Sequence, residues 1–166
     1  MGSDGGGRRP LRVAQVGCGQ ISAAHFKAYA DTHLVEVAIV VDIDPVAAQE
    51  AAAANGGVPW TTNVEEALRR DDVDVVSVAT PHYLHAPHAV AALRAGKHVL
   101  CEKPLTVTLE DADSMIFAAQ DFGRSLGMWM VMRYGPAARA ARDLIRDGAI
   151  GRIVNVRLPD VHNKAP

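Results

Sequence analysis

Two glycines near the start of the chain have the type and spacing to hold a phosphate group. Residues 13–16 form a short apolar run, and Gly17 and Gly19 follow it before an alanine-rich, helix-favouring segment. This order predicts a strand, a tight turn and a helix whose first backbone N–H groups are unpaired and lie at the positive end of the helix dipole. Such a helix start binds anions. We expect Gly17 to permit the turn and Gly19 to let a pyrophosphate approach bare backbone.

An acidic residue stands where a ribose-binding carboxylate is expected. A second apolar run, residues 34–41, ends in Asp42, about twenty residues after Ser22, the spacing found in dinucleotide-binding sites. A carboxylate there accepts hydrogen bonds from both ribose hydroxyls and repels a 2′-phosphate, and Ile43 rather than an arginine follows it, so NAD is favoured over NADP. The alternative is an ordinary βαβ unit without a ligand.

A polar loop follows the strand predicted over residues 73–79. It contains Thr80, Pro81 and His82, and Pro81 ends the strand pairing. His82, His85 and His88 are spaced three apart, but no Cys, Asp or Glu completes a metal-ligand set, so we expect no metal site. Contacts to a cofactor or substrate are expected for His82. Half-buried packing is the alternative for His85 and His88.

A lysine follows the strand predicted over residues 97–101, in the sequence Glu102, Lys103, Pro104. If it faces a nicotinamide, its ammonium could polarise a substrate oxygen or hold a hydroxyl during hydride transfer, because it has three donors and an adjustable pKa. From its position alone, a surface lysine beside a proline turn is an equally good interpretation.

Alternating strands and helices must position these residues. We expect a doubly wound parallel α/β sheet, the Rossmann fold, because strand and helix patterns alternate along the chain and right-handed crossovers place helices on both faces. The carboxyl ends of its strands then gather the polar residues at one edge. The expected strands cover residues 13–16, 34–41, 58–60, 73–79, 97–101 and 125–132, and the expected helices cover residues 20–30, 45–54, 64–70, 87–95 and 109–121. Residues 128–132, rich in methionine, are interpreted as a buried strand rather than as a soft ligand surface.

The bulk composition excludes several classes of protein. The chain has 166 residues and a net charge of −2, which gives no support for binding to nucleic acids or acidic membranes. Residues 1–10 lack the apolar centre of a signal peptide and are predicted to form a flexible leader. Cys18 and Cys101 suggest no disulfide framework, and Cys18 is interpreted as a small turn residue rather than a reactive thiolate. We therefore expect a cytoplasmic protein.

From residue 11 to about residue 158 the chain resembles the N-terminal half of the glucose–fructose oxidoreductase / inositol dehydrogenase / MocA-like family. The resemblance rests on GCGQIS at residues 17–22, DIDP at 42–45 and ATPHYLH at 79–85. Its most specific part is AGKHVLCEKPL at residues 95–105, and RY at 133–134 and GAIGRI at 148–153 also match.

The resemblance implies a nicotinamide dinucleotide, NAD, in the glycine turn, with Asp42 on the adenosine ribose. It implies that Lys103 is the catalytic lysine and precedes a cis proline, Pro104. The residues that it assigns to cofactor binding are Gly17, Gly19, Gln20, Ile21, Asp42, Thr80, Pro81, His82, His85, Glu102 and Lys103.

The resemblance also implies a second domain, of which only the start is expected here. Family members are about twice as long, and their substrate domain carries an open sheet with a catalytic Asp-x-x-x-His motif that this sequence lacks. We expect residues 11–132 to form the dinucleotide domain and residues 133–166 to supply one helix (136–147) and one unpaired strand (150–158) of a truncated substrate domain.

The implied reaction moves a hydride between the nicotinamide and a sugar, a polyol or a related hydroxyl or carbonyl compound. Two alternatives stay open: a non-catalytic dinucleotide sensor, and a half-enzyme completed by another chain. A homo-oligomer is also compatible with the resemblance. Retained Glu102 and Lys103 favour an enzyme, because a sensor needs neither residue for chemistry.

Overall fold

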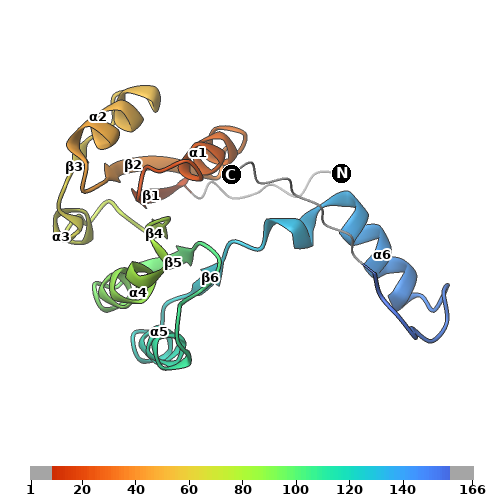
Figure 1. Cartoon of the computed structure of the whole chain (residues 1–166). Coiled ribbons are helices and arrows are strands. Elements are labelled where there is room, and N and C mark those ends of the chain that lie inside the picture. Colours follow the sequence, from red (N-terminus) through yellow and green to blue (C-terminus); the bar gives the residue numbers. More distant parts are fainter. Residues whose placement is uncertain (1–8, 158–166) are drawn as a thin grey trace, which may run out of the picture. The chain divides into compact units, whose positions relative to one another are not determined.

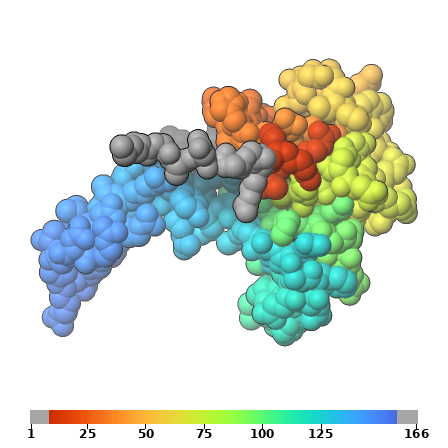
Figure 2. Space-filling model, turned by 180° about the vertical axis from the view of Figure 1, so that it is seen from behind, coloured from red at the N-terminus to blue at the C-terminus, as the bar shows by residue number. Residues whose placement is uncertain are grey.

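The computed structural model describes residues 9–157 of the chain. It divides into two compact units, with the boundary in the sequence between Trp129 and Met130. The first unit contains the sheet, and Figure 2 shows its segments, coloured red to teal, packed against one another. The expected leader lies outside the described residues up to residue 8, and Arg9 is bound to the first unit through the Asp74 carboxylate at 2.6 and 2.8 Å.

The first unit is a six-stranded, fully parallel sheet in the order β3-β2-β1-β4-β5-β6. This topology confirms the doubly wound α/β fold predicted from the alternating pattern. The strands are β1 (Leu11–Val16), β2 (Val35–Val41), β3 (Trp60–Thr61), β4 (Val75–Val78), β5 (His98–Cys101) and β6 (Leu126–Met128).

Helices cover both faces of the sheet, with α1 and α2 on one side and α3, α4 and α5 on the other (Figure 1). The α-helices are α1 (Ser22–Ala30), α2 (Pro45–Ala54), α3 (Val64–Leu68), α4 (His85–Arg94), α5 (Leu109–Asp121) and α6 (Pro136–Arg146), and the 3-10 helices are η1 (His82–Leu84) and η2 (Val131–Tyr134).

Side-chain caps explain where two of these helices begin. Helix α2 starts after Asp44, whose carboxylate accepts the Val46 N–H at 2.9 Å, and Pro45 occupies its first turn. Helix α3 starts after Asn63, whose side chain accepts the Glu65 N–H at 3.0 Å. Both are residue types that favour the N-cap position, so the starts predicted for these helices are confirmed.

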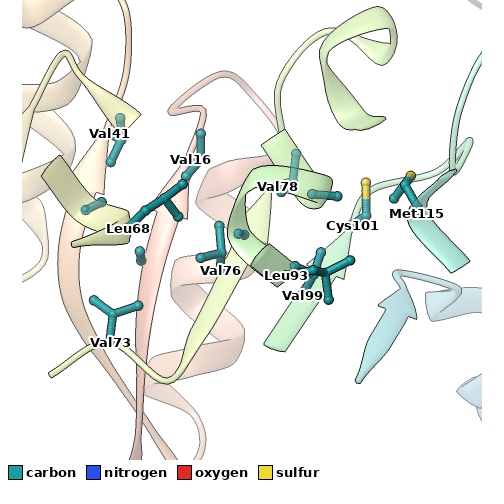
Figure 3. Close-up of a cluster of buried hydrophobic side chains, with 14 of the residues drawn as sticks. Val16, Val41, Leu68, Val73, Val76, Val78, Leu93, Val99, Cys101 and Met115 are labelled. Atoms are coloured by element: carbon teal, nitrogen blue, oxygen red, sulfur yellow. The ribbon is translucent and has the colours of Figure 1, made fainter. Parts of the chain in front are cut away.

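The main core lies between the sheet and helices α3, α4 and α5. Val76 and Val78 of β4 are fully buried, as is Leu93 of α4, and Figure 3 shows such side chains from neighbouring strands meeting those of the helices. The near-continuous apolar sequence of β4 suits a strand covered on both faces.

The strand register aligns the carboxyl ends of the sheet. Val16 at the end of β1 pairs with Val41 of β2 and with Val78 of β4, and Val78 pairs with Cys101 of β5. The residues that directly follow these four strands therefore start from the same edge, as the sequence predicted.

Several boundaries differ from the sequence expectation by one or two residues, and the end of β6 differs by four. Helix α4 begins at His85 rather than near Pro87, because a proline is tolerated in the first turn of a helix. The methionine-rich segment was wrongly predicted to be a buried strand. Strand β6 ends at Met128, and Val131 and Met132 are 61% and 82% exposed, because the chain leaves the sheet after Trp129 and enters η2.

The second unit contains η2 and α6, and the helix predicted over residues 136–147 is present as Pro136–Arg146. The strand predicted from residue 150 is not formed over the described residues 150–157. A strand is held by hydrogen bonds to a neighbouring strand, and the described part of the second unit offers none. No helix among the described residues is long and apolar enough to cross a membrane.

Candidate functional site

The turn after β1 requires a glycine at its first position. Gly17 has a φ of +93°, and a Cβ there would lie 2.5 Å from the carbonyl oxygen of Ala79. Its N–H donates to the Val41 carbonyl at 2.8 Å, so the turn is fastened to both neighbouring strand ends. Any side chain at Gly17 would force these ends apart.

The start of α1 is open. Within residues 9–157, a Cβ at Gly19 would meet no atom within 4 Å apart from its chain neighbours, and Ile21 at the N-cap position supplies no side-chain hydrogen bond. Ser22 is buried and its hydroxyl donates back to the Gly19 carbonyl at 2.6 Å. The first N–H groups of α1 are thus free of a side-chain cap, the arrangement that favours an anion.

Asp42 is held next to the glycine turn by two backbone donors. Its Oδ2 accepts the Cys18 N–H at 2.7 Å, and its Oδ1 accepts the Asp44 N–H at 2.9 Å. Each carboxylate oxygen has a further lone pair. The half-buried side chain is therefore fixed in place and can still accept hydrogen bonds from a ligand.

A cavity of about 440 Å³ lies at this edge of the sheet. It is of a size found for small-molecule sites. Five residues predicted to bind a cofactor line it: Gly17, Gly19, Asp42, Thr80 and Pro81. Residues that sequence reasoning missed supply most of its remaining wall: Ile43, Thr62, Val64, Tyr83, Leu84 and His88. Tyr83 and Leu84 fall inside the quoted family motif, whereas Thr62 and Val64 reach the cavity only through the fold.

A second hollow, of about 680 Å³, lies between α1 and α2 on another side of the turn. Gln20 lines this hollow together with Gly19, and Asp42 is not part of its wall. Ile21 is 44% exposed and lines neither hollow. The structure thus separates Gln20 and Ile21 from the wall that carries Asp42.

The three histidines have different surroundings. His85 is fully buried, with Nδ1 2.9 Å from the Pro104 carbonyl oxygen and Nε2 2.9 Å from the Thr80 carbonyl oxygen. It therefore joins the loops that follow β4 and β5 instead of pointing into the cavity. His82 is exposed, and His88 contacts the Thr80 hydroxyl at 3.4 Å.

Burial lowers the pKa of His88, and the nearby His85 lowers it further. The ring that lines the cavity is thus neutral at neutral pH and adds no positive charge there. Among residues 9–157, no three His, Cys, Asp or Glu side chains lie close enough together to hold a metal ion.

Glu102 and Lys103 form a contrasting pair after β5. Glu102 is buried, with Oε1 2.8 Å from His25 Nε2 and Oε2 accepting the Lys103 N–H at 2.9 Å. Lys103 is exposed, and its peptide bond to Pro104 is cis. Within the described chain the Lys103 ammonium has no ion-pair partner, so its donors are available to a ligand.

The two cysteines are not reactive thiolates. Burial, reinforced by the Asp42 carboxylate, raises the pKa of Cys18 to about 12. Burial and Glu102 raise the pKa of Cys101 to about 12 as well. Both thiols stay protonated at neutral pH, which agrees with Cys18 as a small residue of the turn.

The residues at this edge fit a dinucleotide. Uncapped N–H groups at Gly19 and the start of α1 suit a pyrophosphate, and the adjacent carboxylate of Asp42 suits ribose hydroxyls. The apolar walls suit an aromatic base. Lys103, which follows a different strand at the same edge, carries an exposed ammonium group.

Comparisons with known proteins agree with this geometry. The family model for the oxidoreductase family with an NAD-binding Rossmann fold (GFO_IDH_MocA) matches residues 11–128. A 1,5-anhydro-D-fructose reductase from Ensifer adhaerens is 46% identical over 122 residues, which cover 72% of this chain and 37% of the reductase.

Two solved structures are similar in fold and sequence. Levoglucosan dehydrogenase in complex with NADH and levoglucosan has a TM-score of 0.82 and 35% identity, over 86% of this chain and 41% of the dehydrogenase. A 3-ketoreductase from Actinomadura kijaniata in complex with TDP-benzene and NADP has a TM-score of 0.79 and 35% identity, over 87% and 44%. The chain spans about two fifths of the length of these relatives.

Proposed function

This chain belongs to the oxidoreductase family with an NAD-binding Rossmann fold, the family of glucose–fructose oxidoreductase, inositol dehydrogenase and MocA, and we propose that it is the cofactor-binding half of an NAD-dependent dehydrogenase. In this proposal the whole enzyme transfers a hydride between NAD and a sugar, a polyol or a related compound. The named activities of the relatives, a 1,5-anhydro-D-fructose reductase and a levoglucosan dehydrogenase, support this substrate class.

The observation that carries the proposal is the clamped carboxylate of Asp42. Two backbone N–H groups fix it beside Gly19, so its free lone pairs need no rearrangement to meet a ribose. A carboxylate at this position repels a 2′-phosphate. Ile43 and Asp44, the next residues, offer no positive charge to compensate, which supports NAD over the NADP bound by the 3-ketoreductase.

The proposal assigns the catalytic role to Lys103. When bound, the nicotinamide supplies the hydride donor or acceptor. The exposed Lys103 ammonium would donate a hydrogen bond to the oxygen of the reacting carbon. Glu102 would lie near the nicotinamide end of the cofactor. Gln20, Ile21 and His82 are proposed to contribute to the dinucleotide site around its loops. His85 is proposed to support the site from inside, by joining the loops that contain Thr80 and Pro104.

The second unit is proposed to begin the substrate domain, with residues 133–166 as its first part. We propose a reducing compartment such as the cytoplasm, which suits two unpaired cysteines. A homo-oligomer, or a second chain that completes the site, is the alternative source of substrate-binding residues.

Turnover tests the proposal against its alternatives. The longest available form of the protein is incubated with NAD and a panel of sugars and polyols, and NADH formation is followed by absorbance. The proposal predicts turnover on at least one member, lost in Lys103→Ala. Tight NADH binding without turnover on any substrate supports a sensor, and activity only after a second chain is added supports a half-enzyme.

A further inference from the structure

We propose that His25 is a positioning residue that holds the Glu102 carboxylate, and through it the backbone of Lys103, in place for the nicotinamide half of the cofactor. This inference rests on the proposed function. His25 lies in helix α1, 77 positions before Glu102 in the sequence, and no motif quoted above contains it.

The Glu102 carboxylate has one donor on each oxygen. His25 Nε2 lies 2.8 Å from Oε1, and the Lys103 N–H donates to Oε2 at 2.9 Å. The His25 and Glu102 side chains are only 4% and 10% exposed. A buried carboxylate that loses a donor is strongly destabilised, so without His25 the carboxyl group would turn toward water or take up a proton. Either change would weaken its hold on the Lys103 N–H.

The imidazole ring of His25 is itself held in one orientation. It stacks on Trp129 with ring centroids 4.4 Å apart and an interplanar angle of 12°. Trp129 follows β6, and its backbone N–H donates to the Cys101 carbonyl at 2.9 Å. The sheet edge therefore places the tryptophan, and the tryptophan fixes the plane from which His25 reaches Glu102.

The same face of α1 is also tied to the glycine turn. Tyr29, one helical turn after His25, donates its hydroxyl hydrogen to Gln15 Oε1 at 3.1 Å. The Gln15 amide in turn donates to the Gly17 carbonyl at 3.0 Å. Helix α1 thus fastens the phosphate-binding end of the site through Tyr29 and the lysine end through His25.

One polar atom of the ring is left unsatisfied. Within residues 9–157, His25 Nδ1 is buried and has no hydrogen-bond partner. A phenylalanine would keep the stack on Trp129 without this cost. A histidine that stacks equally well but leaves Nδ1 unpaired is explained by what Nε2 does for Glu102.

Ligands of different length separate a positioning role from a general loss of structure. NADH and ADP are titrated calorimetrically into the wild-type chain, His25→Phe and His25→Gln. Phenylalanine keeps the stack and removes the donor, whereas the amide of glutamine can place an N–H near the position of Nε2. We expect His25→Phe to raise the NADH dissociation constant roughly ten-fold, the loss typical of a hydrogen bond to a charged group. The ADP dissociation constant should stay within about two-fold of the wild-type value. His25→Gln should restore most of the NADH affinity.

A second readout needs no cofactor. The amide resonance of Lys103 in a ¹⁵N–¹H spectrum reports its bond to Glu102, and it should move in His25→Phe and return toward the wild-type position in His25→Gln. If the phenylalanine variant does not fold, His25→Asn replaces it, because asparagine is too short to reach Glu102 Oε1.

Equal losses for NADH and ADP, an unchanged NADH affinity, or a Lys103 resonance that does not move would each overturn the inference. Failure of the proposed function has a different signature: the wild-type chain binds neither NADH nor ADP. That result would also remove the role assigned to His25.

Discussion

The backbone N–H of Cys18 donates to Asp42 Oδ2 at 2.7 Å and so joins the glycine turn after β1 to the carboxylate after β2. The two residues are 24 positions apart in the sequence, and the pairing of Val16 with Val41 brings them together. Because this hydrogen bond links the turn to the carboxylate, a substitution that moves one of them also moves the other.

Asp42→Ala should weaken NADH binding and reduce the discrimination against NADPH. The variant loses the ribose acceptor and the negative charge that repels a 2′-phosphate, so the NADH dissociation constant should rise roughly ten- to hundred-fold. Titration with both cofactors measures the ratio of the NADPH to the NADH dissociation constant. Asp44→Ala is the matched control, since it removes a nearby carboxylate that caps α2. An unchanged ratio in Asp42→Ala would rule out the ribose role.

Gly19→Val should abolish cofactor binding in a domain that still folds. Among the described residues, no atom beyond the chain neighbours lies within 4 Å of a Cβ at Gly19, so the valine side chain would occupy the space that we propose for the pyrophosphate. Circular dichroism and thermal melting check the fold, and calorimetry checks binding. Retained NADH affinity in the folded variant would defeat the phosphate-turn interpretation.

Gly17→Ala should instead destabilise the fold. The added Cβ would lie 2.5 Å from the Ala79 carbonyl oxygen, at a φ of +93°, and a clash with backbone plus a strained φ costs on the order of 2–4 kcal/mol. Urea denaturation measures the loss relative to wild type. A Gly17→Ala domain as stable as wild type would mean that the turn is not fastened as described.

Asp74→Asn should reduce stability at neutral pH, with a loss that fades in acid. The hydrogen bond from Arg9 is the main cause that holds the pKa of Asp74 at about 2, below its ordinary value of 3.8. A depressed pKa contributes stability above the ordinary value, and this contribution disappears as the pH falls from about 4 to about 2. Urea titrations of both proteins at pH 7, 4 and 2.5 should show the difference shrinking. A difference that stays constant with pH would point to packing rather than charge.

Much of this edge could be predicted from the sequence. The apolar runs before Gly17, Asp42 and Thr80 are dense enough to mark buried parallel strands, and a parallel sheet necessarily gathers the residues after them. The caps at Asp44 and Asn63 are local signals, because both partners of each hydrogen bond lie within a few residues.

Long-range contacts explain what could not be predicted. His25 meets Glu102 only because the fold brings α1 close to the residue that follows β5, and nothing local distinguishes His25 from a packing histidine. His85 was assigned to cofactor binding through a motif, whereas its ring nitrogens lie on two backbone carbonyl oxygens. The local sequence does not distinguish a histidine that binds a cofactor from one that bonds to groups of the protein itself.

The strand prediction for the methionine-rich segment, residues 128–132, was wrong for a related reason. Its apolar sequence suits a strand, but strand β6 has a partner only along β5, where Met128 pairs with Cys101 as the last residue. Beyond that point, Val131 and Met132 pair with no strand among residues 9–157. Strand formation at a sheet edge depends on the length of the neighbour, which the segment itself does not encode.

The most direct test of the account is a calorimetric titration of this chain with NADH and, separately, with NADPH. The account predicts one saturable site for NADH and at least roughly ten-fold weaker binding of NADPH, because the fixed carboxylate of Asp42 accepts the ribose hydroxyls and repels the 2′-phosphate. Absence of saturable NADH binding, or equal affinity for the two cofactors, would contradict it.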